Sequence, residues 1–113
     1  MAAGYQELFL EKGADFTTSL TLADVNGDPY NLYGYTAKSQ VKKSYYSSNA
    51  TAQFTITITA PTTGVITLGL PSANTANIAA GRYVYDVVIK DSANTVTRVL
   101  EGIVNVLPSV TVF

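Results

Sequence analysis

Apolar and polar residues alternate along most of this chain, which is the pattern of half-buried β-strands. In the clearest run, Ala52, Phe54, Ile56 and Ile58 alternate with polar residues that are mostly threonine. No segment shows the three-to-four-residue spacing of apolar positions that a long amphipathic helix needs. The alternation predicts strands over residues 16–22, 35–43, 52–59, 65–70, 81–89 and 95–106.

Turn-forming residues separate these strands at intervals of about 8 to 12 residues, as in β-sandwiches. Asn26-Gly27 favours a turn after the first strand, and residues 60–64 close a hairpin. A short helical turn is expected near residues 72–79, with Ser72 as its cap. The pattern therefore predicts an all-β sandwich of about seven strands.

The strand over residues 81–89 is the most informative. Both of its faces are largely apolar, which is expected of a strand at the centre of a sheet. Gly81, Tyr83 and Tyr85 resemble the Gly-x-Tyr-x-Cys pattern of the sixth strand in immunoglobulin-like domains, with Tyr83 as the structural corner tyrosine. Tyr85 stands where that family has cysteine, and the chain contains no cysteine. We therefore expect an immunoglobulin-like β-sandwich without a disulfide.

The chain has 113 residues, and we expect a single sandwich domain over residues 1–113. Residues 1–11 and 107–113 are expected to be terminal arms. The first is either an edge strand or an arm that reaches a neighbour. The last is either the final strand of the sandwich or a segment that pairs with a neighbouring subunit. Both carry apolar candidates for an interaction surface: Tyr5, Phe9, Val110, Val112 and Phe113.

Charge is sparse, at 13% of residues with a net charge of −1, so repulsion between copies is weak and association is favoured. Lys38, Lys42 and Lys43 form the one basic cluster, which we interpret as a solvated strand face. Nucleic acid is therefore not an expected partner. A bilayer-spanning apolar segment and a signal-peptide pattern are both missing from the sequence. We expect no membrane partner, and synthesis in a cytoplasm.

The sequence offers little catalytic chemistry, because it contains neither histidine nor cysteine. Residues 24–28 resemble the start of a calcium loop but lack the later ligands. Asp86 has apolar neighbours and is expected to make a structural ion pair, while an enzyme that uses Asp86 with Glu101 is a distant alternative. We therefore expect no catalytic residues, no cofactor and no metal site.

Tyr45 and Tyr46 lie in a loop without periodicity between two strands. Tyrosine combines apolar area with a polar tip at a low entropic cost, so exposed tyrosines suit a carbohydrate-binding or host-recognition surface. The plainer interpretation is that some of the tyrosines of the chain are core rings and others only decorate the outer face. A glycan is thus the alternative partner, and Tyr45 and Tyr46 join the candidate interaction residues.

The order of short motifs over most of the chain resembles a known family. These motifs cover residues 26–32, 35–43, 64–68, 81–87 and 100–106. Together they resemble the small immunoglobulin-like virion structural proteins of tailed, T4-like bacteriophages. They are also similar to the N-terminal domain of phage baseplate upper proteins.

This resemblance implies a non-enzymatic virion protein of the head, neck, tail or baseplate. Such a component, for example a capsid decoration protein, is made in the host cytoplasm and ends in the virion. The implied partners are other virion proteins and further copies of the same chain, bound through sheet edges and terminal arms.

Overall fold

The computed structural model describes residues 4–23 and 26–111. Within these ranges the elements are β1 (Gly4–Tyr5), β2 (Leu8–Glu11), β3 (Phe16–Thr21), β4 (Thr36–Lys42), β5 (Ala52–Ala60), a 3₁₀ turn (Pro61–Thr63), β6 (Val65–Leu70), α1 (Ser72–Thr75), β7 (Gly81–Lys90) and β8 (Val96–Leu107). Each of the six strands expected from the alternation forms, with bounds that agree to within one residue. The all-β fold class is therefore confirmed.

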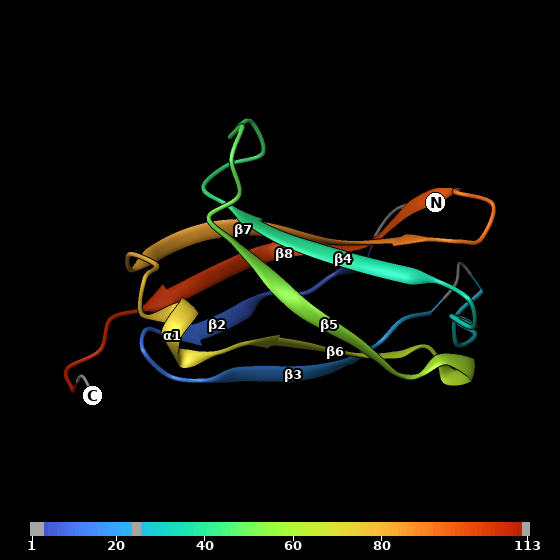
Figure 1. Ribbon diagram of the computed structural model, residues 1–113, viewed down its shortest axis with the longest axis horizontal. Helices are drawn as coiled ribbons and strands as arrows, with labels where there is room; N and C mark the ends of the chain where they lie inside the picture. Colours follow the sequence, from blue (N-terminus) through green and yellow to red (C-terminus); the bar gives the residue numbers. More distant parts are fainter. Residues whose placement is uncertain (1–3, 24–25, 112–113) are drawn as a thin grey trace.

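The strands form one continuous sheet that folds over on itself into two layers (Figure 1). The order of neighbouring strands is β1-β8-β7-β4-β5-β6-β3. β5 belongs to both layers, because its first residues pair with β4 and its later residues pair with β6. β7 pairs with β8 on one side and β4 on the other, which confirms its expected central place.

The core lies between the two layers and is made by the inward positions of the alternating strands. Val41, Ile66 and Leu68 are completely buried, so the threonines between the apolar residues face outward. The Tyr85 ring meets Phe54 edge-on, with 6.0 Å between ring centroids. An aromatic contact between β7 and β5 thus lies where immunoglobulin domains have a disulfide-bonded cysteine.

Tyr83 is buried at the start of β7, and its hydroxyl donates a hydrogen bond of 2.7 Å to the backbone carbonyl of Ala79. This bond ties the strand to the crossing that precedes it, as a tyrosine corner does. The Lys43 ammonium lies 4.7 Å from the centre of the same ring. Lys43 therefore packs against an aromatic face and is not a purely solvated charge.

The first described residues form edge strands of the chain's own sheet. β1 and β2 both pair in parallel with β8, with Gly4 opposite Leu100 and Leu8 opposite Val104. Leu8 and Leu10 are buried, so the hydrophobic effect holds this segment on the fold. Of the two alternatives left open for this segment, an edge strand or an arm that reaches a neighbour, the structure has residues 4–11 as edge strands.

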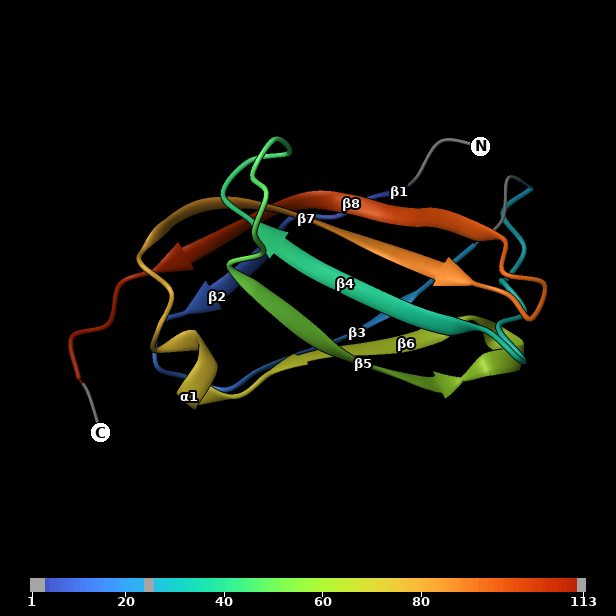
Figure 2. The ribbon, with the colours of Figure 1, turned by 45° about the horizontal axis from the view of Figure 1, so that its top comes forward.

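The C-terminal end of the described chain, in contrast, is not held on the sheet. After β8 the described residues 108–111 form no strand and extend away from the body (Figures 1 and 2). The side chain of Val110 is fully exposed. Val112 and Phe113, which are candidate interaction residues, lie outside the described residues.

The short helix sits at the corner between the layers, but Ser72 does not cap it. Pro71 occupies the N-cap position without a side-chain hydrogen bond. The Ser72 amide instead donates to the Asp15 carboxylate, 2.6 Å away. A carboxylate from the turn after β2 therefore takes the capping role. The sequence of residues 72–79 alone could not predict this, because Asp15 lies far from them along the chain.

Gly102 marks a close approach between two strands. The pairing of β8 with β7 is regular at Gly102, because its irregular step lies where Val87 faces Leu100 and Val88 faces Arg98. A Cβ at Gly102 would collide with the Gln6 carbonyl oxygen and would lie 2.9 Å from its carbon. The missing side chain lets the β1–β2 segment run close beside β8.

The Tyr85 hydroxyl also holds the β1–β2 segment in place, because it donates a hydrogen bond to the Gln6 carbonyl oxygen at 2.6 Å. Burial raises the pKa of the Tyr85 phenol well above its ordinary value, and the nearby Tyr5 adds to this effect. Above about pH 10 the unfolded chain ionises this phenol whereas the folded chain does not. The stability that depends on the neutral phenol is therefore complete below pH 10 and declines as the pH rises towards the folded pKa.

We expect Tyr85→Phe to cost about 1 kcal/mol at pH 8, because the bond to Gln6 is lost. The variant has no phenol at this position, so its stability lacks the decline at alkaline pH that ionisation of Tyr85 causes. The difference in stability should thus shift by about 1.4 kcal/mol in favour of the variant between pH 9 and pH 11, so that the natural protein loses its advantage by pH 11. Urea unfolding at both pH values measures the gap. A gap that stays constant or widens with pH would contradict this role of Tyr85.

Candidate interaction surfaces

Two open strand edges lie beside each other at one side of the sandwich. β2 is the outer strand of one layer, and among the described residues β3 pairs only with β6 in the other. A cleft of about 280 Å³ lies between them. It is lined by Phe9, Glu11, Ala14, Asp15, Phe16, Thr17 and Leu107. We name these seven residues the edge cleft.

The backbone of β3 presents amides to this opening. The Leu22 amide donates to the Gly64 carbonyl, which leads into β6. Amides alternate in direction along a strand, so those of Thr17, Ser19 and Thr21 point away from β6. An extended segment placed along β3 can therefore accept these hydrogen bonds.

Apolar side chains accompany the open edge of β1 and β2. Tyr5 is 63% exposed and Phe9 is 58% exposed. Phe9 projects from the outward side of β2, and Leu107, at the end of the neighbouring β8, is exposed beside it. The structure thus brings Phe9 to the edge cleft, with Tyr5 on the same edge at β1.

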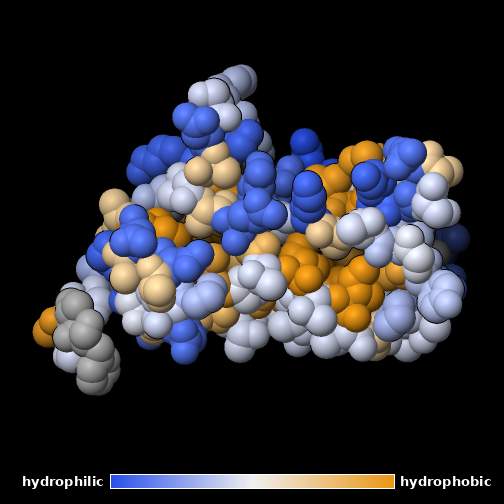
Figure 3. Space-filling model, viewed as in Figure 1, coloured by the Kyte–Doolittle hydropathy of each residue, from blue (hydrophilic) through white to orange (hydrophobic). Residues whose placement is uncertain are grey.

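Sequence analysis missed a second apolar opening. β4 and β5 pair only as far as Ser39 opposite Phe54, and beyond this point the two strands diverge. Ile56 and Ile58 are consequently only partly buried. Apolar side chains are visible along this part of the surface (Figure 3). The alternation identified both isoleucines as inward residues but could not show that the strands separate.

The outer face of β3, β6 and β5 carries hydroxyl groups and no charge. Pairing sets Ser19 beside Thr67 and Thr67 beside Thr57. The hydroxyls of Ser19 and Thr59 each lie within hydrogen-bond distance of Thr67, at 3.2 and 3.3 Å. The full hydroxyl face contains Thr17, Ser19, Thr21, Thr55, Thr57, Thr59 and Thr67. This face can approach another surface without desolvating an ion.

The outer face of β8, β7 and β4 is charged instead. Register and burial place five of the seven basic residues of the chain on it: Lys38, Lys42, Arg82, Lys90 and Arg98. Asp86, Glu101 and Glu7 lie on the same face. Arg98 contacts Asp86 at 3.4 Å and Glu101 at 3.6 Å. The expected ion pair of Asp86 is therefore present, and its partner is Arg98.

Tyr45 and Tyr46 are adjacent in sequence but differ in their surroundings. Their loop stands out from the body between β4 and β5 (Figure 2). Tyr46 is 97% exposed, whereas Tyr45 is 58% exposed and lines a hollow of about 170 Å³. The other lining residues are Gln40, Lys42, Val84, Tyr85, Asp86 and Arg98. We name this the Tyr45 hollow.

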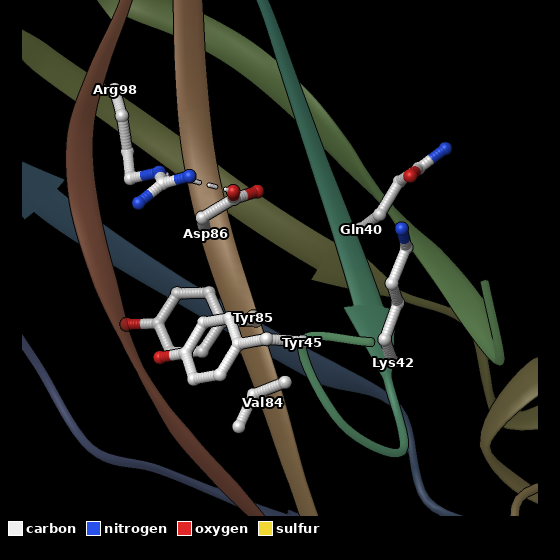
Figure 4. Close-up of a pocket in the computed structure, with 7 residues that line it drawn as sticks. All are labelled: Gln40, Lys42, Tyr45, Val84, Tyr85, Asp86 and Arg98. Carbon is white, nitrogen blue, oxygen red and sulfur yellow. Dashed lines mark ion pairs between the residues drawn. The ribbon is translucent and has the colours of Figure 1, made fainter. Parts of the chain in front are cut away.

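The hollow is polar on its flanks (Figure 4). Gln40 and Lys42 lie on one side, and Asp86 with Arg98 lies on the other. The Tyr85 side chain is buried and bonded to Gln6. Sequence reasoning named Tyr45 but missed its companions, because only the pairing of Gln40 with Asp86 brings them together.

The described residues were also compared with the requirements of a metal site and of a membrane-spanning helix. Within residues 4–23 and 26–111, histidine, cysteine and carboxylate side chains form no group of three that could hold a metal ion. Asp24, in the segment that resembles a calcium loop, lies outside the described residues. In the part of the chain that the structure describes, no helix is long and apolar enough to cross a membrane.

Comparison with solved structures returns varied β domains. An internalin-like protein of Listeria monocytogenes, lmo2027, is 18% identical with a TM-score of 0.50, over 93% of this chain and 28% of that one. CopC from Methylosinus trichosporium OB3b is 14% identical with a TM-score of 0.47, over 100% of this chain and 91% of that one. The likeness to the internalin-like protein shows the fold alone. A search of curated proteins gives no match.

The family comparison is more specific. Residues 3–106 match the family described as "LtfC-like, beta-sandwich domain". LtfC is a phage-associated tail fibre protein, so the resemblance to phage β-sandwich domains is confirmed at this level. The match includes both strands of the edge cleft and the strands beneath the Tyr45 hollow. The chain belongs to the LtfC-like β-sandwich domain family.

Proposed function

We propose that this chain is a non-enzymatic structural protein of a bacteriophage virion, which binds other virion proteins and further copies of itself. The observation that carries the proposal is the edge cleft, where two unpaired strand edges open between apolar side chains. An extended segment of a neighbouring protein satisfies such an edge with main-chain hydrogen bonds and fills the cleft with its side chains.

Other surfaces support assembly. The hydroxyl face is uncharged, and the described C-terminal residues 108–111 project from the body with Val110 fully exposed. These residues can serve as the extended segment that a neighbour receives. Within the virion we place the protein in the tail or baseplate in preference to the head or neck, because LtfC is tail-associated and the motif order resembles T4-like baseplate upper proteins.

The charged groups support a binding role over a catalytic one. Asp86 and Glu101 are the adjacent carboxylates named as a distant catalytic alternative, and Arg98 contacts both. The shared contact with Arg98 gives both carboxylates an ion-pair partner within the protein, which supports a structural role for them. We propose synthesis in the host cytoplasm, location in the virion, and no nucleic-acid or membrane partner.

The first test is direct. Mass spectrometry of purified particles should detect the chain at a fixed ratio to known tail proteins. Size-exclusion chromatography with light scattering should show multimers of the purified protein, or a complex with a virion protein. A chain that is strictly monomeric and missing from particles would overturn the proposal.

Blocking the open edge of β3 should abolish assembly while the fold remains. In Thr17→Pro the lost amide is one that points away from β6, so the β3–β6 pairing keeps its hydrogen bonds. We expect stability to change by less than about 1 kcal/mol, and complex formation in light scattering to be lost.

Thr17→Val is the matched control, because it changes the same side chain but keeps the backbone amide. It should assemble as the natural protein does. Equal assembly of both variants would show that the β3 edge is not the contact.

A further inference from the structure

We propose that the Tyr45 hollow binds an acidic sugar residue, such as the uronic acid of a surface polysaccharide. This inference goes beyond the structural role proposed above and does not rest on it. The hollow lies over β4 and β7, and it shares no residue with the edge cleft. A sugar can therefore occupy it whether or not the edges are paired.

The aromatic part of the hollow comes from Tyr45. Its ring is partly exposed over the outer side of β7, close to the half-buried Val84. A pyranose ring has an apolar face of C–H groups, and a tyrosine ring stacks on such a face while its hydroxyl remains solvated. Tyr45 and Val84 thus supply a non-polar floor against which one sugar ring can lie.

The polar part surrounds this floor with groups that suit sugar hydroxyls. Asp86 accepts hydrogen bonds through its carboxylate, and the Gln40 amide both donates and accepts. Arg98 holds the Asp86 carboxylate at 3.4 Å, which fixes its orientation before a ligand arrives. Placement of donors and acceptors in advance lowers the entropic cost of binding.

Lys42 favours a negatively charged ligand. Its ammonium makes no ion pair or hydrogen bond with another described residue, although it lines the hollow opposite Asp86. Lys38 lies two outward positions away along β4, and the outer face carries five basic side chains against four carboxylates, Glu7, Glu11, Asp86 and Glu101. A ligand carboxylate beside Lys42 would give this ammonium its partner.

The size of the hollow limits the ligand. Pockets for drug-sized molecules have volumes of about 300–1,000 Å³, and this hollow has about 170 Å³. It therefore accommodates one sugar ring and not a folded oligosaccharide. Tyr45, which lines the hollow, is 58% exposed, so the neighbouring sugars of a polymer can continue outside.

The test uses the full chain, labelled with ¹⁵N and titrated separately with glucuronic acid and glucose. Glucuronic acid should cause saturable shifts of the Val84 and Asp86 amides, and its Kd should be about fivefold lower than that of glucose. Tyr45→Ala should raise the Kd for glucuronic acid about tenfold. Lys42→Gln should remove the preference for glucuronic acid over glucose.

Tyr46→Ala is the matched control, because Tyr46 is the adjacent tyrosine, is almost fully exposed, and is not among the residues that line the hollow. It should bind as the natural chain does. The proposal is overturned if neither sugar causes saturable shifts, or if Tyr46→Ala weakens binding as much as Tyr45→Ala does. Equal Kd values for the two sugars in the natural chain would overturn its acidic specificity. Each of these outcomes leaves the particle and light-scattering results unaffected.

Discussion

Replacing Gly102 with alanine should destabilise the protein by about 3 kcal/mol and lower its melting temperature by roughly 15 °C. The added Cβ would collide with the Gln6 carbonyl oxygen and lie 3.1 Å from the Tyr85 ring. Gln6 is held in place by the hydrogen bond that its backbone amide donates to the Glu101 carbonyl and by the one that its own carbonyl accepts from the Tyr85 hydroxyl. The methyl group can be accommodated only if the β1–β2 segment moves off β8.

Gly69→Ala is the matched control, because Gly69 also lies inside a strand. A Cβ there would lie 3.7 Å from its nearest neighbour, the Phe16 carbonyl oxygen, so the change should cost less than about 1 kcal/mol. Thermal and urea unfolding measure both variants. Equal stabilities of the two variants would show that Gln6 does not lie against Gly102.

Replacing Thr75 with valine should cost about 2 kcal/mol, although the two side chains have similar shapes. The Thr75 hydroxyl is completely buried. It accepts a hydrogen bond from the Gly13 amide at 3.1 Å and donates to the Ala14 carbonyl at 2.9 Å. Valine would remove both of these part-buried hydrogen bonds, each of which contributes about 1 kcal/mol.

Thr75→Ser retains the hydroxyl and loses only a methyl group, so it should cost about 1 kcal/mol. The difference between the two variants isolates the hydrogen bonds from the packing. Urea unfolding monitored by tyrosine fluorescence gives both values. A serine variant as unstable as the valine variant would assign the effect to the methyl group.

Individual positions show how far the sequence could be interpreted. The inward places of Phe54, Ile66 and Leu68 followed from alternation alone, because a strand sends successive side chains to opposite faces. The central place of residues 81–89 followed from apolar residues on both faces. These inferences need only local geometry and the hydrophobic effect.

The misplaced expectations all involve partners that are distant along the chain. Residues 4–11 have the same composition whether they pair with β8 or with a neighbour, and the burial of Leu8 and Leu10 identifies the partner. Ser72 is a good capping residue by type, yet Asp15 lies nearer to the helix amide. The need for glycine at position 102 depends on Gln6, whose carbonyl oxygen lies against it.

For the candidate sites, too, the sequence indicated single residues and the structure showed which residues lie together. The sequence indicated Tyr5, Phe9, Tyr45 and Tyr46 as surface aromatics, but it treated the last two as a pair. The structure separates them, because Tyr45 turns toward Gln40, Lys42 and Asp86 while Tyr46 does not line the hollow. Strand register decides this, and register links residues more than forty positions apart.

The sequence by itself thus determined the strands, the disulfide-free sandwich and the phage-related character of the chain, since these depend on periodicity, composition and motif order. The tertiary structure alone decided which edges remain open, which terminal segment is held on the sheet and which polar groups surround Tyr45. The physical reason is that alternation specifies the face on which a side chain lies, whereas the neighbour across a strand is specified only when all the strands pack together.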